Sequence, residues 1–224
     1  MSSVRRQFPT DSRWPLSLLV VLAVVLVWSW INAYDRMTWW LEAFPALIAV
    51  PLLAATRKRF PFTPLAYFLI AVHASILFVG AHYTYERVPL FDWVRSAFHL
   101  ARNDYDKVGH LAQGFVPAII AREMLIRLRV LQRRGWLVFL VMCICMAISA
   151  CYELVEWGVA MLEGSSADAF LGTQGDPFDT QSDMFCALIG AALAQILLPR
   201  FHDRQIARIE AVTGIGAFVR ERAE

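Results

Sequence analysis

Acidic residues are concentrated in one stretch of this 224-residue chain, from Asp168 to Asp183. The stretch carries four carboxylates and no Lys or Arg, and it lies between two apolar segments. The upstream apolar segment ends close to Glu153 and Glu156. Carboxylates crowded at a membrane boundary repel one another and are costly to remove from water. Because such a cluster needs a cation, a proton or a polar ligand, the sequence predicts a functional site here.

Polar residues recur at helical spacing near the ends of three apolar segments. Residues three or four apart lie on one face of a helix, so each group can point into a shared space. A last helix that begins near Pro177 would align the aspartates of the acidic stretch. The three groups are Asp106, His110 and Gln113; Glu153 and Glu156; and Asp176, Asp179 and Asp183.

Convergence of these groups would create an oxygen-rich metal site. Such donors suit Mg²⁺, Mn²⁺ or Ca²⁺, and sites of carboxylates and histidine also bind Zn²⁺. If the metal activates water, Glu153 or His110 is the predicted general base. A structural interpretation stands beside this one, because aspartates also cap helix N-termini. The predicted metal ligands are Asp106, His110, Glu153, Glu156, Asp176, Asp179 and Asp183.

A polar ligand is expected beside the metal. The expected class is a lipid head group or a lipid-linked phosphate, held through the cation. The residues predicted to contact this ligand are His82, Tyr85, Lys107, Gln113 and Gln174. In contrast, Glu123 and Arg127 are four apart near the other end of their segment, and we interpret them as a structural ion pair.

The composition predicts an all-α, polytopic membrane helix bundle. The chain is 58% hydrophobic and 18% charged, whereas soluble domains carry roughly 25% charged residues. Its apolar blocks are continuous rather than alternating, which favours helices over a membrane barrel. Residues 1–224 are expected to form a single integral-membrane domain. The six predicted spans cover about 15–34, 38–55, 64–85, 107–128, 136–162 and 183–201.

The basic residues predict the orientation of the bundle. All but five of the 21 Lys and Arg residues fall on the side of the two termini, so both termini are expected to be cytoplasmic. The acidic stretch then faces outward. Residues 202–224 are expected to form a cytoplasmic amphipathic or disordered tail, and the outer connection at about 86–106 contains a short amphipathic helix. The five residues on the outer side are Arg36, Arg87, Arg95, Arg102 and Lys107.

Four segments resemble those of the YjdF family of bacterial inner-membrane proteins. They read GAHYTY at 80–85, YDKVGHLAQGF at 105–115, YELVEW at 152–157 and GTQGDPFDTQSDM at 172–184. The resemblance covers most of the chain and implies a multi-pass protein of the bacterial inner membrane, without an established reaction. A weaker similarity to VanZ-like membrane proteins implies that the same polar constellation is shared. Its matching residues are Asp106, Lys107, His110, Glu153, Asp179 and Asp183.

Three classes of function are compatible with these features. One is a metal-dependent membrane hydrolase or transferase, and another is a proton- or cation-coupled transporter. The last is an accessory structural protein in which a bound ion fixes the helix ends. Membrane lipid is the expected partner and nucleic acid is not; the sequence leaves the metal, the substrate and the oligomeric state open.

Overall fold

The computed structural model describes residues 14–131, 135–163 and 173–213, and every regular element in those ranges is an α-helix. The start of the acidic stretch and the end of the predicted tail lie outside these ranges. The predicted spans correspond to α1 (Trp14–Trp30), α2 (Arg36–Thr56), α3 (Pro64–Tyr83), α5 (Tyr105–Arg127), α6 (Gly135–Glu163) and α8 (Asp179–Leu197). Two more helices are α4 (Pro89–Phe98) and α9 (Pro199–Thr213). The prediction of an all-α polytopic bundle is confirmed.

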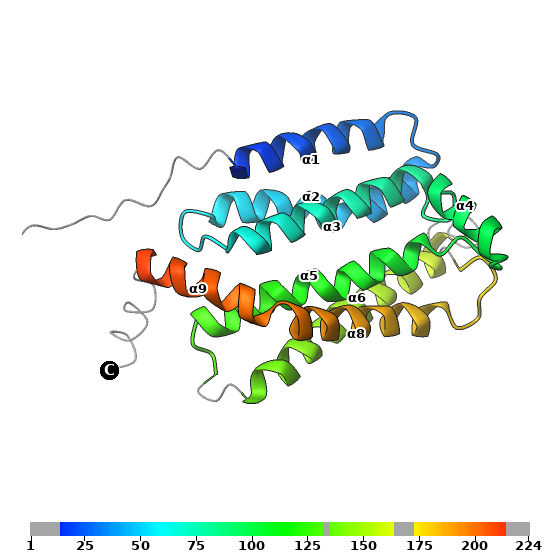
Figure 1. The fold of residues 1–224 in the computed structure, drawn as a ribbon. Helices are drawn as coiled ribbons and strands as arrows, with labels where there is room; N and C mark the ends of the chain where they lie inside the picture. The colour runs from blue at the N-terminus through cyan, green and yellow to red at the C-terminus, as the bar shows by residue number, and fades with distance from the viewer. Residues whose placement is uncertain (1–13, 132–134, 164–172, 214–224) are drawn as a thin grey trace, which may run out of the picture.

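The long helices lie side by side and alternate in direction along the chain (Figure 1). At one end lie α4 and the connection into α8, and at the opposite end lie α9 and the start of α1 (Figure 1). The basic turn after α2 and the C-terminal end of α5 also lie at the α9 end (Figure 1). The basic and acidic features recognised in the sequence are therefore separated along the length of the bundle.

The central helix of the bundle is also its most polar long helix. α2, α3, α6 and α8 are long and apolar enough to cross a membrane, and α1 is a shorter apolar helix. α5 has 23 residues, enough for about 34 Å at 1.5 Å per residue. It packs against α3, α6 and α8, and it buries Asp106, His110, Glu123 and Arg127. Charged side chains on a spanning helix face the protein interior, so the polarity of α5 follows from its place.

Small residues allow α5 and α8 to approach closely. A Cβ added at Gly114 of α5 would lie 1.8 Å from the carbonyl oxygen of Ala187. A Cβ added at Gly190 of α8 would lie 2.0 Å from the carbonyl oxygen of Leu111. The backbones of the two helices are thus in contact, which fixes the relative positions of the polar residues at their ends.

A buried ion network closes the α9 end of the bundle. The Glu123 carboxylate accepts hydrogen bonds from the Thr63 backbone N–H at 3.0 Å and its hydroxyl at 2.8 Å. The same carboxylate pairs with Arg127 at 2.6 Å and lies 3.1 Å from His202 Nε2. Because His202 belongs to α9, this network ties α9 to α3 and α5. The predicted ion pair of Glu123 and Arg127 is confirmed.

The short amphipathic helix predicted in the outer connection is α4. Its Phe91 ring packs edge-on against Tyr105 at 5.3 Å between centroids. Leu90, Trp93 and Phe98 remain 64%, 65% and 69% exposed. A helix with one packed side and several exposed apolar side chains, at the end of a membrane bundle, is typical of an interfacial helix.

Candidate functional site

The polar residues singled out in the sequence gather at the α4 end of the bundle. The start of α5 contributes Asp106, Lys107 and His110, and the start of α8 contributes Asp179 and Asp183. The second half of α6 contributes Glu153. α8 begins at Asp179, with Phe178 at its N-cap, so the helix starts two residues later than the sequence predicts. Asp176 therefore lies in the turn before the helix rather than on its face.

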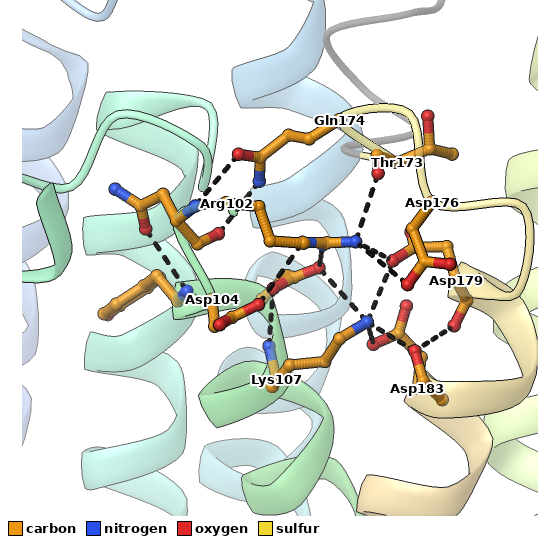
Figure 2. Close-up of polar contacts among 12 residues, drawn as sticks. Arg102, Asp104, Lys107, Thr173, Gln174, Asp176, Asp179 and Asp183 are labelled. Carbon is orange, nitrogen blue, oxygen red and sulfur yellow. Dashed lines mark hydrogen bonds and ion pairs between the residues drawn. The ribbon is translucent and has the colours of Figure 1, made fainter. Parts of the chain in front are cut away.

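Arg102 organises one half of this cluster from the connection between α4 and α5 (Figure 2). Its guanidinium pairs with Asp106, and it contacts Asp179 Oδ1 at 2.5 Å and the Thr173 carbonyl oxygen at 3.1 Å. Asp104 Oδ1 lies 3.3 Å from Arg102 Nε, and Asp176 Oδ2 lies 3.7 Å from Arg102 Nη1. Burial alone would lower the pKa of Arg102, but Asp106 and Asp179 outweigh it, and the pKa lies above its ordinary value. Arg102 is therefore a permanent cation.

Lys107 occupies the other half of the cluster (Figure 2). Its ammonium nitrogen lies 2.8 Å from Asp179 Oδ1, 2.8 Å from Asp183 Oδ1 and 2.7 Å from the Ser182 hydroxyl. It also lies 3.6 Å from Asp106. Four of the predicted metal ligands thus pair with Arg102 or Lys107; they are Asp106, Asp176, Asp179 and Asp183.

Asp183 also belongs to a group with His110 and Glu153, which lies next to these ion pairs. One ligand atom from each residue falls within 4.8 Å of the others, and all three residues are buried. His110 Nδ1 lies 3.8 Å from Glu153 Oε1, and His110 Nε2 lies 3.7 Å from Asp183 Oδ2. His110 Nδ1 and Glu153 Oε1 are buried without a hydrogen-bond partner in the described structure. Most of the predicted metal ligands therefore pair with Arg102 or Lys107, whereas the trio keeps two buried atoms, His110 Nδ1 and Glu153 Oε1, that could bind a metal ion.

The predicted ligand-contacting residues Gln174 and Gln113 have different places in the structure. The Gln174 amide accepts a hydrogen bond from the Asn103 N–H at 3.0 Å and donates one to the Asn103 carbonyl at 2.8 Å. This pair joins the turn before α8 to the residue after Arg102. Gln113, one turn beyond His110 on α5, interacts with the His110 side chain. Gln113 is therefore beside the trio, whereas Gln174 positions the chain around it.

The remaining predicted ligand contacts are His82, which lies apart from the trio, and Tyr85. A Cβ added at Gly109, the residue before His110, would lie 3.1 Å from the Tyr85 ring. His82 stacks on Trp28 with centroids 4.5 Å apart, and its Nδ1 lies 3.0 Å from the Ser29 carbonyl of α1. Tyr85 has a left-handed backbone (φ 56°) and is buried. A Cβ added at Gly80 would lie only 2.3 Å from the Tyr85 ring.

Glu42 of α2 is a buried acid that the spacing of polar residues in the sequence does not connect with the site. Its carboxylate accepts a hydrogen bond from the Tyr152 hydroxyl at 2.9 Å, and Tyr85 is a second partner. The Tyr152 ring in turn meets the His110 ring edge-on at 6.2 Å between centroids. Glu156, a predicted metal ligand, is buried beside Glu42 and Glu153 and outside the trio. The sequence feature that could have indicated Glu42 is that it is a lone glutamate within an apolar span, where acids are typically functional.

Comparison with known proteins identifies the family. The sequence profile described as "Predicted membrane protein (DUF2238)" matches residues 14–204. The chain belongs to this family. The inner membrane protein YjdF of Escherichia coli (strain K12) is 51% identical over 195 residues, which cover 87% of this chain and 93% of that protein. No solved structure matches the chain at a significant level. The predicted family and inner-membrane location are confirmed, and the VanZ-like similarity stays a prediction.

Proposed function

We propose that this inner-membrane protein binds one divalent cation through His110, Glu153 and Asp183. The observation that supports this proposal is the pair of buried, unpartnered atoms His110 Nδ1 and Glu153 Oε1. Leaving a buried polar atom unsatisfied costs about 1–3 kcal/mol. A cation among the three side chains would recover that cost, and one imidazole with two carboxylates suits Mn²⁺ or Zn²⁺, with Mg²⁺ and Ca²⁺ as harder alternatives.

The proposed ligand of the cation is a phosphate oxygen of a lipid head group or of a lipid-linked phosphate. Carboxylates outnumber cationic side chains around the trio, so a bare phosphate would be repelled. Three protein ligands leave coordination positions open, and a cation there would bridge carboxylates to phosphate. If a bound ester is hydrolysed or transferred, Glu153 would act as general base through the carboxylate oxygen that does not hold the metal.

Ion content tests the metal half of this proposal. Detergent-purified protein would be stripped with a chelator, dialysed against Mn²⁺ and measured by elemental analysis. We expect one bound ion per chain in the wild type and almost none in Glu153→Gln or His110→Ala. Glu86→Gln, which changes a carboxylate of the outer connection away from the trio, is the matched control and should retain the ion. Equal ion content in folded wild type and Glu153→Gln would contradict the proposal.

Lipid binding tests the second half separately. Short-chain phosphatidic acid would be titrated into the Mn²⁺-loaded protein and into the chelator-treated protein. We expect at least tenfold weaker binding without Mn²⁺ or in Glu153→Gln. If phosphatidic acid binds equally well without Mn²⁺ and in Glu153→Gln, the phosphate ligand is excluded from the proposal, and only the metal site is retained. A loss of melting temperature on metal removal, with no ligand binding, would favour the accessory structural class.

Glu42 favours a proton- or cation-coupled transporter as the second candidate. A buried acid on α2 with tyrosine partners extends the polar residues from the trio into the bundle. Intramembrane acids of this kind mark ion or proton pathways in transporters. Proteoliposome flux of Mn²⁺ or protons that is lost in Glu42→Gln would select this class over the first.

A further inference from the structure

A second group of acidic residues shares Asp183 with the trio. Asp106, Asp179 and Asp183 each offer a carboxylate oxygen, and these oxygens lie within 4.8 Å of one another. That spacing would admit a cation, but the chain supplies one itself. The Lys107 ammonium lies 2.8 Å from both Asp179 and Asp183 and 3.6 Å from Asp106.

We infer that Lys107 fills a second divalent-cation position with its own ammonium group and so limits the outer site to one metal ion. An ammonium group has three N–H donors. Two of the short contacts of Lys107 Nζ are with Asp179 and Asp183, and another, at 2.7 Å, is with Ser182 Oγ. The group is thus held by oxygen atoms from α8, with Asp106 of α5 close by, in the manner of a bound cation. Only the first metal position, at the trio, rests on the proposed function.

Asp183 connects the two positions. Its Oδ1 atom binds Lys107 at 2.8 Å, and its Oδ2 atom lies 3.7 Å from His110 Nε2. A carboxylate that uses its two oxygens for two cations is the bridging arrangement of sites with two metal ions, where the ions lie about 3.5–4 Å apart. Lys107 is therefore a positioning residue, because it fixes one oxygen of Asp183 and so orients the other toward the trio.

A plain salt bridge and a filled cation position predict different results when Lys107 is removed. If Lys107 only adds attraction between α5 and α8, its loss destabilises the bundle and changes no ion content. If it fills a cation position, its loss leaves three close carboxylates with Arg102, which pairs with Asp106 and Asp179, and a divalent cation can then balance the remaining negative charge. The number of bound ions per chain separates the two, because a purely structural role would not change it.

The experiment measures bound Mn²⁺ in four proteins after chelation and dialysis at a fixed pH. Relative to the wild type, Lys107→Ala should bind one additional ion per chain, which doubles the content if the trio holds one. Lys107→Arg keeps a positive charge and should bind no additional ion. The double variant Lys107→Ala with Glu153→Gln should retain only the additional ion. If the proposed trio site fails, the wild type binds none and Lys107→Ala still binds one.

Two further readouts complete the test. Mn²⁺ should raise the melting temperature of Lys107→Ala more than that of the wild type. In the variant, two ions that share Asp183 should show magnetic coupling in the electron paramagnetic resonance spectrum. Lys107→Gln replaces the alanine variant if that protein does not fold, with the same additional ion expected. A folded, monodisperse Lys107→Ala or Lys107→Gln with the ion content of the wild type would overturn the inference.

Discussion

At the scale of single residues, two buried glutamates at opposite ends of the bundle show how hydrogen-bond partners separate structure from function. Glu123 has a partner for each oxygen: Thr63 and Arg127 for Oε1, and Thr63 and His202 for Oε2. Glu153 keeps one oxygen without a partner in the described structure. A satisfied buried carboxylate holds helices together, whereas an unsatisfied one is costly unless a ligand completes it.

This contrast predicts opposite effects for two substitutions. Glu123→Ala leaves the Arg127 charge buried without its partner, which costs about 3–5 kcal/mol in the free energy of unfolding. Its Mn²⁺ content should not change. Glu153→Gln should lose Mn²⁺ and alter the unfolding free energy of the metal-free protein by less than about 1 kcal/mol. Titration of the metal-free protein with a denaturing detergent measures the unfolding free energy of both variants. A larger loss of unfolding free energy in Glu153→Gln than in Glu123→Ala would contradict the prediction.

The sequence singled out the members of the trio, together with other acids, because helical spacing is a local property, and it missed the partners that come from elsewhere. Asp106 and His110, or Glu153 and Glu156, share a face by their positions alone. In contrast, Arg102 precedes its helix and reaches Asp179 across 77 residues. Glu42 and Tyr152 meet across 110 residues. Neither contact leaves a spacing signal in one sequence, so the division of the acidic cluster was visible only in the fold.

At the scale of elements, the contact between α5 and α8 sets the geometry of the site. These helices supply His110 and Asp183 to the trio, and their backbones touch at Gly114 and Gly190. Packed helices do not deform continuously, so an added methyl group must separate them or shift one along the other.

Gly114→Ala and Gly190→Ala should therefore reduce both stability and metal binding. Each added Cβ would meet backbone atoms within about 2 Å, and overpacking of this kind typically costs about 1–3 kcal/mol. Gly158→Ala on α6 is the matched control, since a Cβ there meets nothing within 4 Å. The control should be neutral, or stabilising by up to about 1 kcal/mol through helix propensity. Thermal unfolding and Mn²⁺ titration measure the two effects, and equal behaviour of all three variants would contradict the prediction.

The helices themselves were predictable because long apolar runs have few alternatives in a membrane. Their boundaries depended on local hydrogen bonds that composition does not report. Before α8, the Asp176 N–H donates to the Thr173 carbonyl at 2.8 Å, and the Asp176 carboxylate accepts from the Phe178 N–H at 2.9 Å. These bonds form a turn through Pro177, so the helix starts at Asp179 and Asp176 turns toward Arg102.

At the scale of the whole molecule, the orientation decides which ions and lipids the site meets. The bundle separates a basic end, with α9, from an acidic end, with α4 and the start of α8 (Figure 1). The positive-inside rule predicts that the basic end lies in the cytoplasm. The proposed metal site would then draw its ion from outside the cytoplasm and its lipid from the outer leaflet of the inner membrane.

Cysteine accessibility tests this orientation directly. In a background with the four native cysteines replaced by alanine, Arg87→Cys lies in the connection between α3 and α4, and Lys58→Cys lies in the basic turn after α2. A membrane-impermeant maleimide should label Arg87→Cys in intact spheroplasts and Lys58→Cys only after lysis. The reverse pattern would place the trio on the cytoplasmic side. The ion network at Glu123 and the trio lie at opposite ends of the bundle, so the Glu123 network would then face the outside. The structure of each group would be unchanged, and the proposed ligand would become a lipid of the inner leaflet.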